Sequence, residues 1–381
     1  MAQQRADAQD HRGVTVKNSR LPCFSGLEQN TVSVLPVRRV LFPIMWSVMK
    51  NTKVLSVLGL MSLASTAAVA ASGPTLGSLF DASGIQVSGA VAGSFRQDAN
   101  DALNSFQVDQ GLLSISYQPQ SGFGAAVDVA TGDYNDQAGN VGRPNSGVAL
   151  SQAYLQYKSG ALTVQGGRVY TAAGYEVFPV TGNLFVTRSL AFANESTYHT
   201  GLRASYVVSD AIKVSAGVHD GLFDKLDNQA SVTKNKAFEL GGSWAYSPNL
   251  SLSLTGYVGK NAALDKQSLY SFVATYAFSK DLSFALNVDQ GQKSASDTDK
   301  WNAVAVYATY AVSAKTKVGV RLEDLNAKKE TVAFNDAGAW ALVASHALTN
   351  NLDLRAELSD VDEEGGKDRN VQGAIQAVLK F

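Results

Sequence analysis

Residues 162–165 read LTVQ and residues 199–206 read HTGLRASY, and these two alternating runs enclose a long irregular stretch, 169–198. Alternation of apolar and polar side chains is the pattern of a β-strand whose two faces meet different surroundings. A connection of about thirty residues between strands is rare in a compact domain and is normally either functional or disordered. Its aromatic residues, glycines and Arg/Glu content, with little Ser or Lys, argue against disorder. The stretch therefore predicts two strands joined by a folded insertion.

The same alternation continues to the last residue, for example in 270–278, 282–288 and 352–358. Short and long connections also alternate along the chain. The short connections are 119–121, 159–160, 209–210, 247–249, 279–281, 313–315 and 349–351, and the long ones are 97–102, 133–148, 169–198, 221–235, 261–266, 293–299, 327–335 and 362–368. Short turns at one rim and long links at the other are typical of a transmembrane antiparallel β-barrel. We predict an all-β barrel of sixteen strands, with fourteen and eighteen as the alternatives, and with the third long link folded into the lumen.

Two features favour a membrane barrel over a soluble β-sandwich. The apolar faces carry aromatic residues near the strand ends, as interfacial girdles do, namely Trp244, Tyr246, Tyr257, Tyr276, Phe278 and Trp340. The opposite faces carry too many charges and amides for a packed interior, including Arg203, Lys213, Glu239, Arg321, Glu323, Arg355, Glu357, Gln372 and Gln376. The polar faces must therefore meet water and the apolar faces must meet lipid.

The front of the chain predicts an export signal rather than part of the barrel. Residues 49–53 are short and basic, 54–63 are mostly apolar, and Ala68-Val69-Ala70 has the small residues of a cleavage site. We expect 49–70 to be a signal peptide and 71–381 to be a single outer-membrane barrel domain. Residues 1–48 are expected to result from a start site placed too early, and a genuine N-terminal extension is the alternative.

The composition beyond residue 70 fits an exported protein and excludes several function classes. The only cysteine, Cys23, lies in the front end, so no disulfide framework is predicted. Eight of the 32 basic and three of the 33 acidic residues also lie there, which leaves a formal net charge of −6 for the remainder. No basic patch indicates nucleic-acid binding.

Catalysis and metal binding have little support in the sequence. A serine hydrolase needs a serine paired with a histidine, but His199, His219 and His346 lie on separate strands and outside any serine-nucleophile motif. No paired His/Cys spacing indicates a metal centre. We therefore predict no enzyme activity, no cofactor and no metal. The acidic run 360–364 is interpreted as a solvated loop, with a divalent-ion site at the lipopolysaccharide layer as the alternative.

The last strand, 371–381, places Val371, Gly373, Ile375, Ala377, Leu379 and Phe381 on one face. A C-terminal aromatic residue on such a strand resembles the signal that outer-membrane barrels present to their assembly machinery. We therefore expect that machinery, outer-membrane lipid and lipopolysaccharide to be partners. A homo-trimer is compatible with the sequence, which does not decide the oligomeric state.

Several short motifs resemble one known family. They are Gly174-Tyr175-Glu176, Thr187-Arg188-Ser189, His199-Thr200-Gly201-Leu202-Arg203, Asp220-Gly221, the lead-in 79–84 and the terminal Phe381. The sequence is similar in these places to the putative β-barrel porin-2 group of proteobacterial outer-membrane proteins. The resemblance implies a pore-forming outer-membrane protein but no particular solute. Asp220 departs from the family pattern, which has asparagine before the second glycine.

The link 169–198 is the candidate functional site. A sixteen-strand wall encloses a wide aqueous lumen, so selectivity requires something inside it. Acidic residues of the link facing basic residues of the wall would form a constriction with a transverse field. The residues predicted to form this constriction are Glu176, Arg188, Glu195, Arg203, Lys213, Arg321 and Arg355. The alternative is that Arg168, Arg188 and Glu195 only tie the link to the barrel by salt bridges.

Two functions remain open from the sequence. The first is an outer-membrane porin for passive diffusion of small hydrophilic solutes and ions. The second is a closed barrel that serves as an adhesin, a receptor or a structural protein. Modest lengths of the long links other than 169–198 favour the porin.

Overall fold

The computed structural model describes residues 84–98, 105–133, 147–223, 236–260, 266–293, 299–327, 336–363 and 370–381. The signal peptide and the extension predicted before residue 71, and most of the long links, lie outside these residues. Within the described parts of the chain, no helix has the length and apolarity needed to span a bilayer.

Sixteen strands of 9 to 14 residues make up nearly all of the described regular structure. They are β1 Ile85–Asp98, β2 Ser105–Tyr117, β3 Gly122–Thr131, β4 Val148–Ser159, β5 Leu162–Tyr170, β6 Tyr198–Ser209, β7 Ile212–Asp220, β8 Lys236–Ser247, β9 Leu250–Lys260, β10 Lys266–Ala277, β11 Leu282–Gln292, β12 Lys300–Ala311, β13 Thr316–Ala327, β14 Ala337–Ala347, β15 Leu352–Glu363 and β16 Asn370–Lys380. Two short helices, η3 Val180–Gly182 and α5 Leu190–Asn194, lie between β5 and β6.

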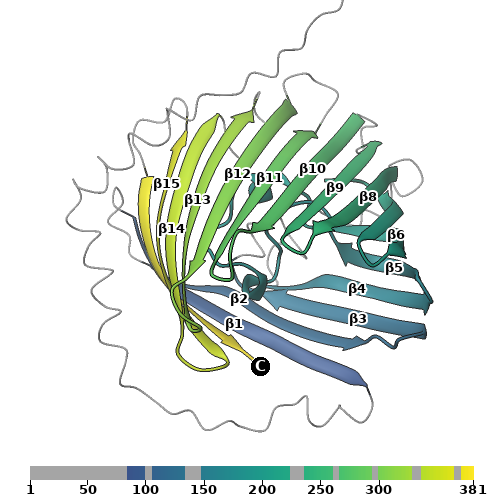
Figure 1. Ribbon diagram of the computed structural model, residues 1–381, viewed down its shortest axis with the longest axis horizontal. Helices are drawn as coiled ribbons and strands as arrows, with labels where there is room; N and C mark the ends of the chain where they lie inside the picture. The colour runs from purple at the N-terminus through teal and green to yellow at the C-terminus, as the bar shows by residue number, and fades with distance from the viewer. Residues whose placement is uncertain are drawn as a thin grey trace, which may run out of the picture.

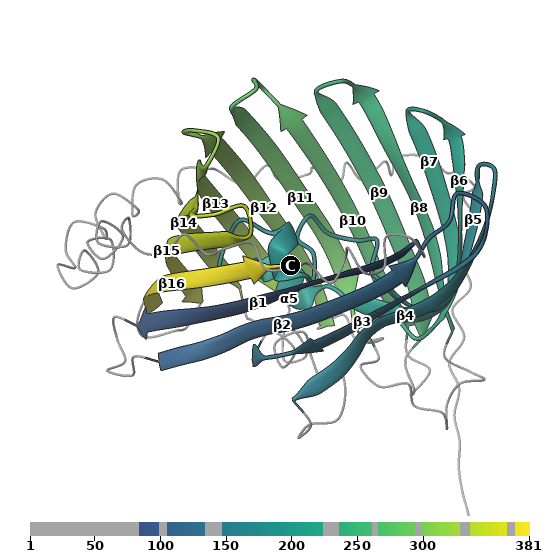
Figure 2. The ribbon, with the colours of Figure 1, turned by 90° about the horizontal axis from the view of Figure 1, so that it is seen from below.

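The strands form one closed antiparallel barrel in which each strand pairs with its neighbours in sequence (Figure 1). The ring closes between β1 and β16, from Ala90 opposite Lys380 to Asp98 opposite Gln372. Closure leaves no unpaired strand edge, which is the condition for a sheet inside a membrane. The prediction of sixteen strands is therefore confirmed. Figures 1 and 2 show the teal segment between β5 and β6, with α5, inside the ring.

All seven predicted short turns fall between consecutive strands. A serine or threonine opens five of them and accepts hydrogen bonds from the backbone N–H groups two and three residues later. These residues are Ser209, Ser247, Ser279, Ser313 and Thr349. In a tight turn these backbone N–H groups have no backbone acceptor, and the hydroxyl oxygen supplies one. This explains why serine or threonine occurs at the start of these turns.

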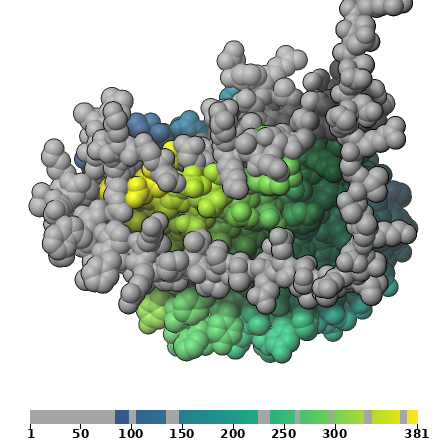
Figure 3. All heavy atoms as spheres, turned by 90° about the horizontal axis from the view of Figure 1, so that it is seen from above, coloured from purple at the N-terminus to yellow at the C-terminus, as the bar shows by residue number. Residues whose placement is uncertain are grey.

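The two faces of the wall differ as the alternation predicts. The apolar side chains of β12 and β13 that point outward, such as Val304 and Val320, are more than a third exposed. Their inward neighbours Arg321 and Glu323 are 2% and 3% exposed. In the space-filling view, the coloured atoms of one face run from yellow through green to teal, in chain order (Figure 3).

The aromatic girdle needs two corrections. Trp340 is 6% exposed rather than open to lipid, and its Nε1 donates to the buried Asp360 carboxylate at 3.3 Å. Trp244, Tyr246, Tyr276 and Phe278 are exposed near the short turns, as expected. Tyr257 instead points inward and is fully buried, because the outward positions of β9 are taken by its neighbours of opposite parity, Gly256 and Val258. Its hydroxyl group contacts the insertion between β5 and β6, as described below.

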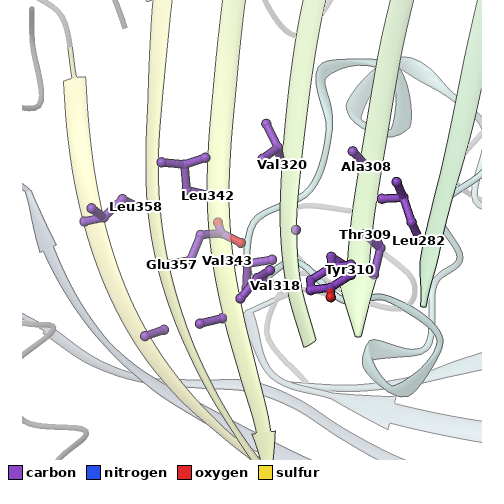
Figure 4. Close-up of a pocket in the computed structure, with 13 residues that line it drawn as sticks. Leu282, Ala308, Thr309, Tyr310, Val318, Val320, Leu342, Val343, Glu357 and Leu358 are labelled. Atoms are coloured by element: carbon purple, nitrogen blue, oxygen red, sulfur yellow. The ribbon is translucent and has the colours of Figure 1, made fainter. Parts of the chain in front are cut away.

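A shallow apolar hollow lies across β11 to β15. Its labelled side chains include Leu282, Val320, Leu342 and Leu358 (Figure 4). Gly319 contributes no side chain here, and on its inner side Leu184 and Phe185 of the insertion pack against it. The hollow therefore belongs to the apolar outer surface.

The C-terminal residue, Phe381, is hydrogen-bonded to Gly89 of β1 and so extends the pairing between the two closing strands. Gly89 donates its N–H to the Phe381 carbonyl at 2.8 Å and accepts from the Phe381 N–H at 3.0 Å. A side chain at position 89 would meet the Phe381 ring, since a Cβ there would lie 2.5 Å from ring atom Cζ.

Deleting Phe381 is expected to reduce the yield of assembled barrel while barrels that do assemble function normally. The deletion removes the last two hydrogen bonds of the closing pair and the ring that covers Gly89. Phe381→Tyr, which keeps the ring, serves as the control. The yield of heat-modifiable, protease-resistant barrel in outer membranes measures the effect, and a wild-type yield from the deletion would contradict the prediction.

Candidate functional site

The insertion between β5 and β6, residues 171–197, is held by side chains from both sides of the ring. We call it the lumen segment. Its backbone and side chains bond to residues of β2, β9, β10, β11, β13 and β15. Because these strands lie in different sectors of the barrel, the segment is tied across the ring (Figure 2).

One attachment of the lumen segment centres on Arg321 of β13. Its Nη1 donates to Glu176 Oε1 at 2.9 Å and to the Thr187 carbonyl at 2.8 Å, and its Nε donates to Glu323 Oε1 at 2.5 Å. The guanidinium also lies over the ring of Phe185, 4.9 Å from its centroid. Arg321 and Glu176 are 2% and 5% exposed, so the ion pair is nearly removed from water. Removing either partner of such a pair would leave the other charge buried without compensation, which destabilises the folded protein.

Two wall carboxylates bind backbone N–H groups of the lumen segment. Glu357 accepts from Val186 N at 2.6 Å and from Thr187 N at 3.0 Å. Glu323 accepts from the N–H of Leu190, the first residue of α5, at 2.5 Å. N–H groups at the start of a helix have no partner within the helix, and a carboxylate satisfies them well.

A third attachment holds η3 against β2 and β15. Gln110 Oε1 accepts from Val180 N at 2.8 Å, and Gln110 Nε2 donates to the Phe178 carbonyl at 3.2 Å. Arg355 reaches the Val180 carbonyl at 3.4 Å. The Val180 side chain is buried with Ala90, Ala92 and Val378.

On the opposite side, the start of the lumen segment is bonded to β9 and β10. The Tyr257 hydroxyl accepts from Ala172 N at 3.0 Å, and Thr255 Oγ1 donates to the Ala172 carbonyl at 3.1 Å. Ser271 Oγ accepts from Gly174 N at 2.9 Å. Gly174 has φ +84°, a conformation that glycine adopts without strain. The Glu195 carboxylate occupies the space that a side chain at position 174 would need.

A buried ionic cluster lies beneath that attachment. Arg203 of β6 forms a fork with Glu239 of β8, with Nε–Oε1 at 2.8 Å and Nη2–Oε2 at 2.7 Å. His219 Nε2 lies 2.9 Å from Glu239 Oε2, and the His199 ring stacks on Tyr257. Arg203 also donates to the Tyr170 carbonyl at 3.0 Å, at the point where the lumen segment leaves β5.

Glu195, which ends α5, faces two polar residues of β11. Asn287 Nδ2 donates to Glu195 Oε1 at 3.3 Å and to Asp289 Oδ2 at 2.9 Å. Burial raises the pKa of the Glu195 carboxyl well above its usual value, and the nearby Asp289 carboxylate raises it further. A raised pKa favours a protonated Glu195, which lowers the charge that this residue presents to passing ions.

The predicted constriction residues are thus distributed among several groups. Glu176 and Arg321 are brought together, while Arg203 pairs with Glu239 instead. Arg355 binds η3, and Arg188 donates to the Phe178 carbonyl within the lumen segment. Lys213 is exposed near the short turn between β6 and β7, away from the other six.

The exposed residues of the lumen segment, all of which is described, carry no charge. They are Ala172, Tyr175, Val177, Thr181, Gly182 and Ala193. The charges of Glu176 and Arg321 are instead directed at each other within the attachment.

Sequence reasoning missed several residues that hold the lumen segment, among them Gln110, Tyr257, Ser271 and Asn287. Each is a polar side chain at an inward position of a strand. Alternation with the outward apolar residues of the same strand would have placed each of them inside the barrel. Ser189 also caps α5, accepting from Phe192 N at 3.0 Å, and a serine at that position is a recognisable N-cap signal.

Among the described residues, no group of three or more His, Cys, Asp or Glu side chains is arranged to hold a metal ion.

The comparisons with known proteins agree with this geometry. The profile of a family described as putative beta-barrel porin-2, OmpL-like, matches residues 84–381. No curated protein matches. The structure is similar to the high-pH structure of OprB of Pseudomonas putida, with a TM-score of 0.61 and 14% identity over 80% of this chain and 96% of that one.

Two further solved structures share the fold. The outer membrane channel DcaP of Acinetobacter baumannii has a TM-score of 0.57 and 13% identity, over 78% of this chain and 97% of that one. A mutant of the Rh. blastica porin has a TM-score of 0.56 and 16% identity, over 78% of this chain and all of that one.

Proposed function

Because the chain belongs to the putative beta-barrel porin-2 family, we propose that small hydrophilic solutes and ions diffuse through its barrel past the lumen segment, which narrows the path. The protein is an outer-membrane porin of a Gram-negative bacterium. The finer proposal concerns what limits passage, and it rests on the bonds that tie residues 171–197 across the ring.

The observation that carries the proposal is the double attachment of the lumen segment. One end is bonded to Tyr257 and Ser271, and the middle is bonded to Arg321 and Glu357. A sixteen-strand wall leaves an aqueous channel of its own accord. A segment held across that channel would reduce its cross-section.

The exposed part of the lumen segment indicates the class of solute. It offers a tyrosine, a threonine, small residues and valine, which suit neutral hydrophilic molecules as well as ions of either sign. We therefore propose weak ion selectivity for the segment itself. That the protein has no enzyme activity stays a prediction.

Purified, detergent-extracted protein is expected to produce stepwise conductance in planar lipid bilayers, with step size proportional to the conductivity of the salt solution. A reversal potential near zero in a salt gradient would agree with weak selectivity. Swelling of proteoliposomes in neutral sugars of increasing mass measures the size limit. Correctly folded barrels that give neither conductance nor swelling would favour the closed barrel and overturn the proposal.

A further inference from the structure

Four of the five strands from β8 to β12 carry an outward lysine at the rim where the long links lie. Lys236 begins β8, Lys260 ends β9, Lys266 begins β10 and Lys300 begins β12. Each shares its strand face with exposed outward residues, which are Phe238, Val258, Tyr270 and Val304 respectively. The four lysine side chains therefore belong to the outer surface of the barrel, at the rim of the long links and in the sector from β8 to β12.

Two of these lysines stand directly opposite each other. Lys260 and Lys266 are paired positions of β9 and β10, and both side chains are exposed. Like charges at paired positions repel and destabilise a sheet unless something neutralises them. Lys236 already has an anionic partner, because it forms an ion pair with Asp220 of β7.

A polar hollow continues this surface toward β13. Its polar lining residues are Ser268, Tyr270, Gln290, Gln292, Lys300, Asn302 and Asn326, and Gly291 and Trp301 also line it. Gln292 pairs with Lys300 and Gln290 with Asn302, so the amides and the ammonium group form one continuous patch. Amide groups both donate and accept hydrogen bonds, which suits sugar hydroxyl groups.

The other side of the barrel ends differently at the same rim. The outward residue near the start of β2 is Phe106, which is 87% exposed, and β4 begins with Val148, which is 55% exposed. In the sector from β8 to β13, the outward residues at the long-link ends of the strands are therefore lysines and amides rather than apolar side chains.

We propose that this lysine–amide face, formed by Lys260, Lys266, Lys300, Gln290, Gln292 and Asn302, binds the phosphorylated sugar headgroup of lipopolysaccharide. Long links face the cell exterior in barrels of this class, so the patch lies at the level of the outer-leaflet headgroups. Lysine binds phosphate as a point charge, and the amides would bond to the glucosamine hydroxyl and amide groups. The apolar side chains beneath it, such as Val258 and Val304, would contact the acyl chains.

Three carboxylates among the described residues of this rim have to be considered. Asp336, which precedes β14, accepts from the Ala327 N–H at 2.6 Å and so lies at the far end of the patch, near Asn326. Asp220 is paired with Lys236 and therefore does not oppose binding at the other three lysines. Asp324 is exposed on β13, next to the amide end of the patch rather than the lysine end. Among the described residues, the lysines of the patch therefore lie on β9, β10 and β12, and the carboxylates at its amide end lie on and beside β13.

The test measures binding of bisphosphorylated lipid A to the purified full-length barrel and to Lys260→Glu/Lys266→Glu. We expect the apparent affinity to fall by about tenfold or more at low salt, because two attractive charges become repulsive. Lys260→Arg/Lys266→Arg should bind like wild type. Lys280→Glu/Lys315→Glu is the matched control, since both lysines lie in exposed short turns at the opposite rim.

Dephosphorylated lipid A separates headgroup recognition from acyl-chain contact. Wild type and the glutamate variant should bind it equally. Heat-modifiable migration checks that each variant is folded, and Lys260→Gln/Lys266→Gln replaces the glutamate variant if that one fails to assemble. Equal affinity of wild type and variant for bisphosphorylated lipid A would overturn the proposal. The proposal would also be overturned if the glutamate variant differed from wild type only in chemical cross-linking between barrels. That result would assign the face to contact with a second copy of this chain.

Discussion

Replacing Arg321 with methionine is expected to release the lumen segment from β13 while the sixteen-strand wall stays intact. Arg321 is the cation for Glu176 and Glu323, and all three side chains are at least 95% buried. Removing one partner of a buried ion pair leaves an uncompensated charge, at a cost of about 3–5 kcal/mol. The wall does not depend on this side chain, because backbone ladders between β12, β13 and β14 hold it.

Trypsin offers a direct readout of that release. Arg188 lies in the lumen segment, where its guanidinium bonds to the Phe178 carbonyl, so cleavage after it requires the segment to open. We expect Arg321→Met to be cut there far faster than wild type and to give noisier, larger conductance steps. Arg321→Lys keeps the charge but loses the fork, and it should give an intermediate result.

Glu176→Gln completes a double-mutant cycle with Arg321→Met. Because the two side chains bond directly at 2.9 Å, the double variant should be less destabilised than the sum of the single variants. Wild-type resistance at Arg188 in Arg321→Met would show that Glu357 and Glu323 hold the segment without this cation.

The architecture was predictable because its signals are local. Alternation such as Leu282 to Val288 defines a strand from nearest neighbours, and Ser279 or Thr349 marks a turn through bonds to N–H groups two and three residues away. The even strand number and the closing partnership of β1 with β16 follow once these units are counted.

The partners of the buried charges were not predictable in the same way. Glu176 and Arg321 are 145 residues apart, and the curvature of a closed ring brings them together. From the sequence, Arg203 was an equally good partner for Glu176, yet it forms its fork with Glu239 two strands away. The charged residues of the sequence indicate that the lumen is polar. Which of them form ion pairs depends on where the lumen segment crosses the barrel.

This pairing changes what the acidic residues of the segment are expected to do. The sequence predicted that Glu176 and Glu195 act on passing ions, in which case neutralising both would shift the reversal potential toward anion preference. In the structure, Glu176 is paired and 5% exposed, and burial and Asp289 raise the pKa of Glu195. We therefore propose that both residues position the lumen segment, and that its size rather than its charge limits passage.

Shortening the lumen segment should then enlarge the pore. Removing residues 174–183 and joining the ends with a Gly-Ser link deletes η3 and the exposed Tyr175 and Val177. The bonds of Val186 and Thr187 to Glu357, and of Leu190 to Glu323, lie outside the deletion and keep the remainder in place. We expect single-channel conductance to increase roughly twofold, because the open cross-section of the wall is much wider than the narrowed path.

The control for this deletion keeps the length and removes the charges. Glu176→Gln/Glu195→Gln should leave both conductance and reversal potential close to wild type, provided that trypsin resistance at Arg188 shows the segment still in place. Larger neutral sugars should pass the shortened variant in the swelling assay but not the neutralised one. If the shortened barrel conducts like wild type, the segment does not limit passage, and the narrowest point must be sought elsewhere along the inward faces of the strands.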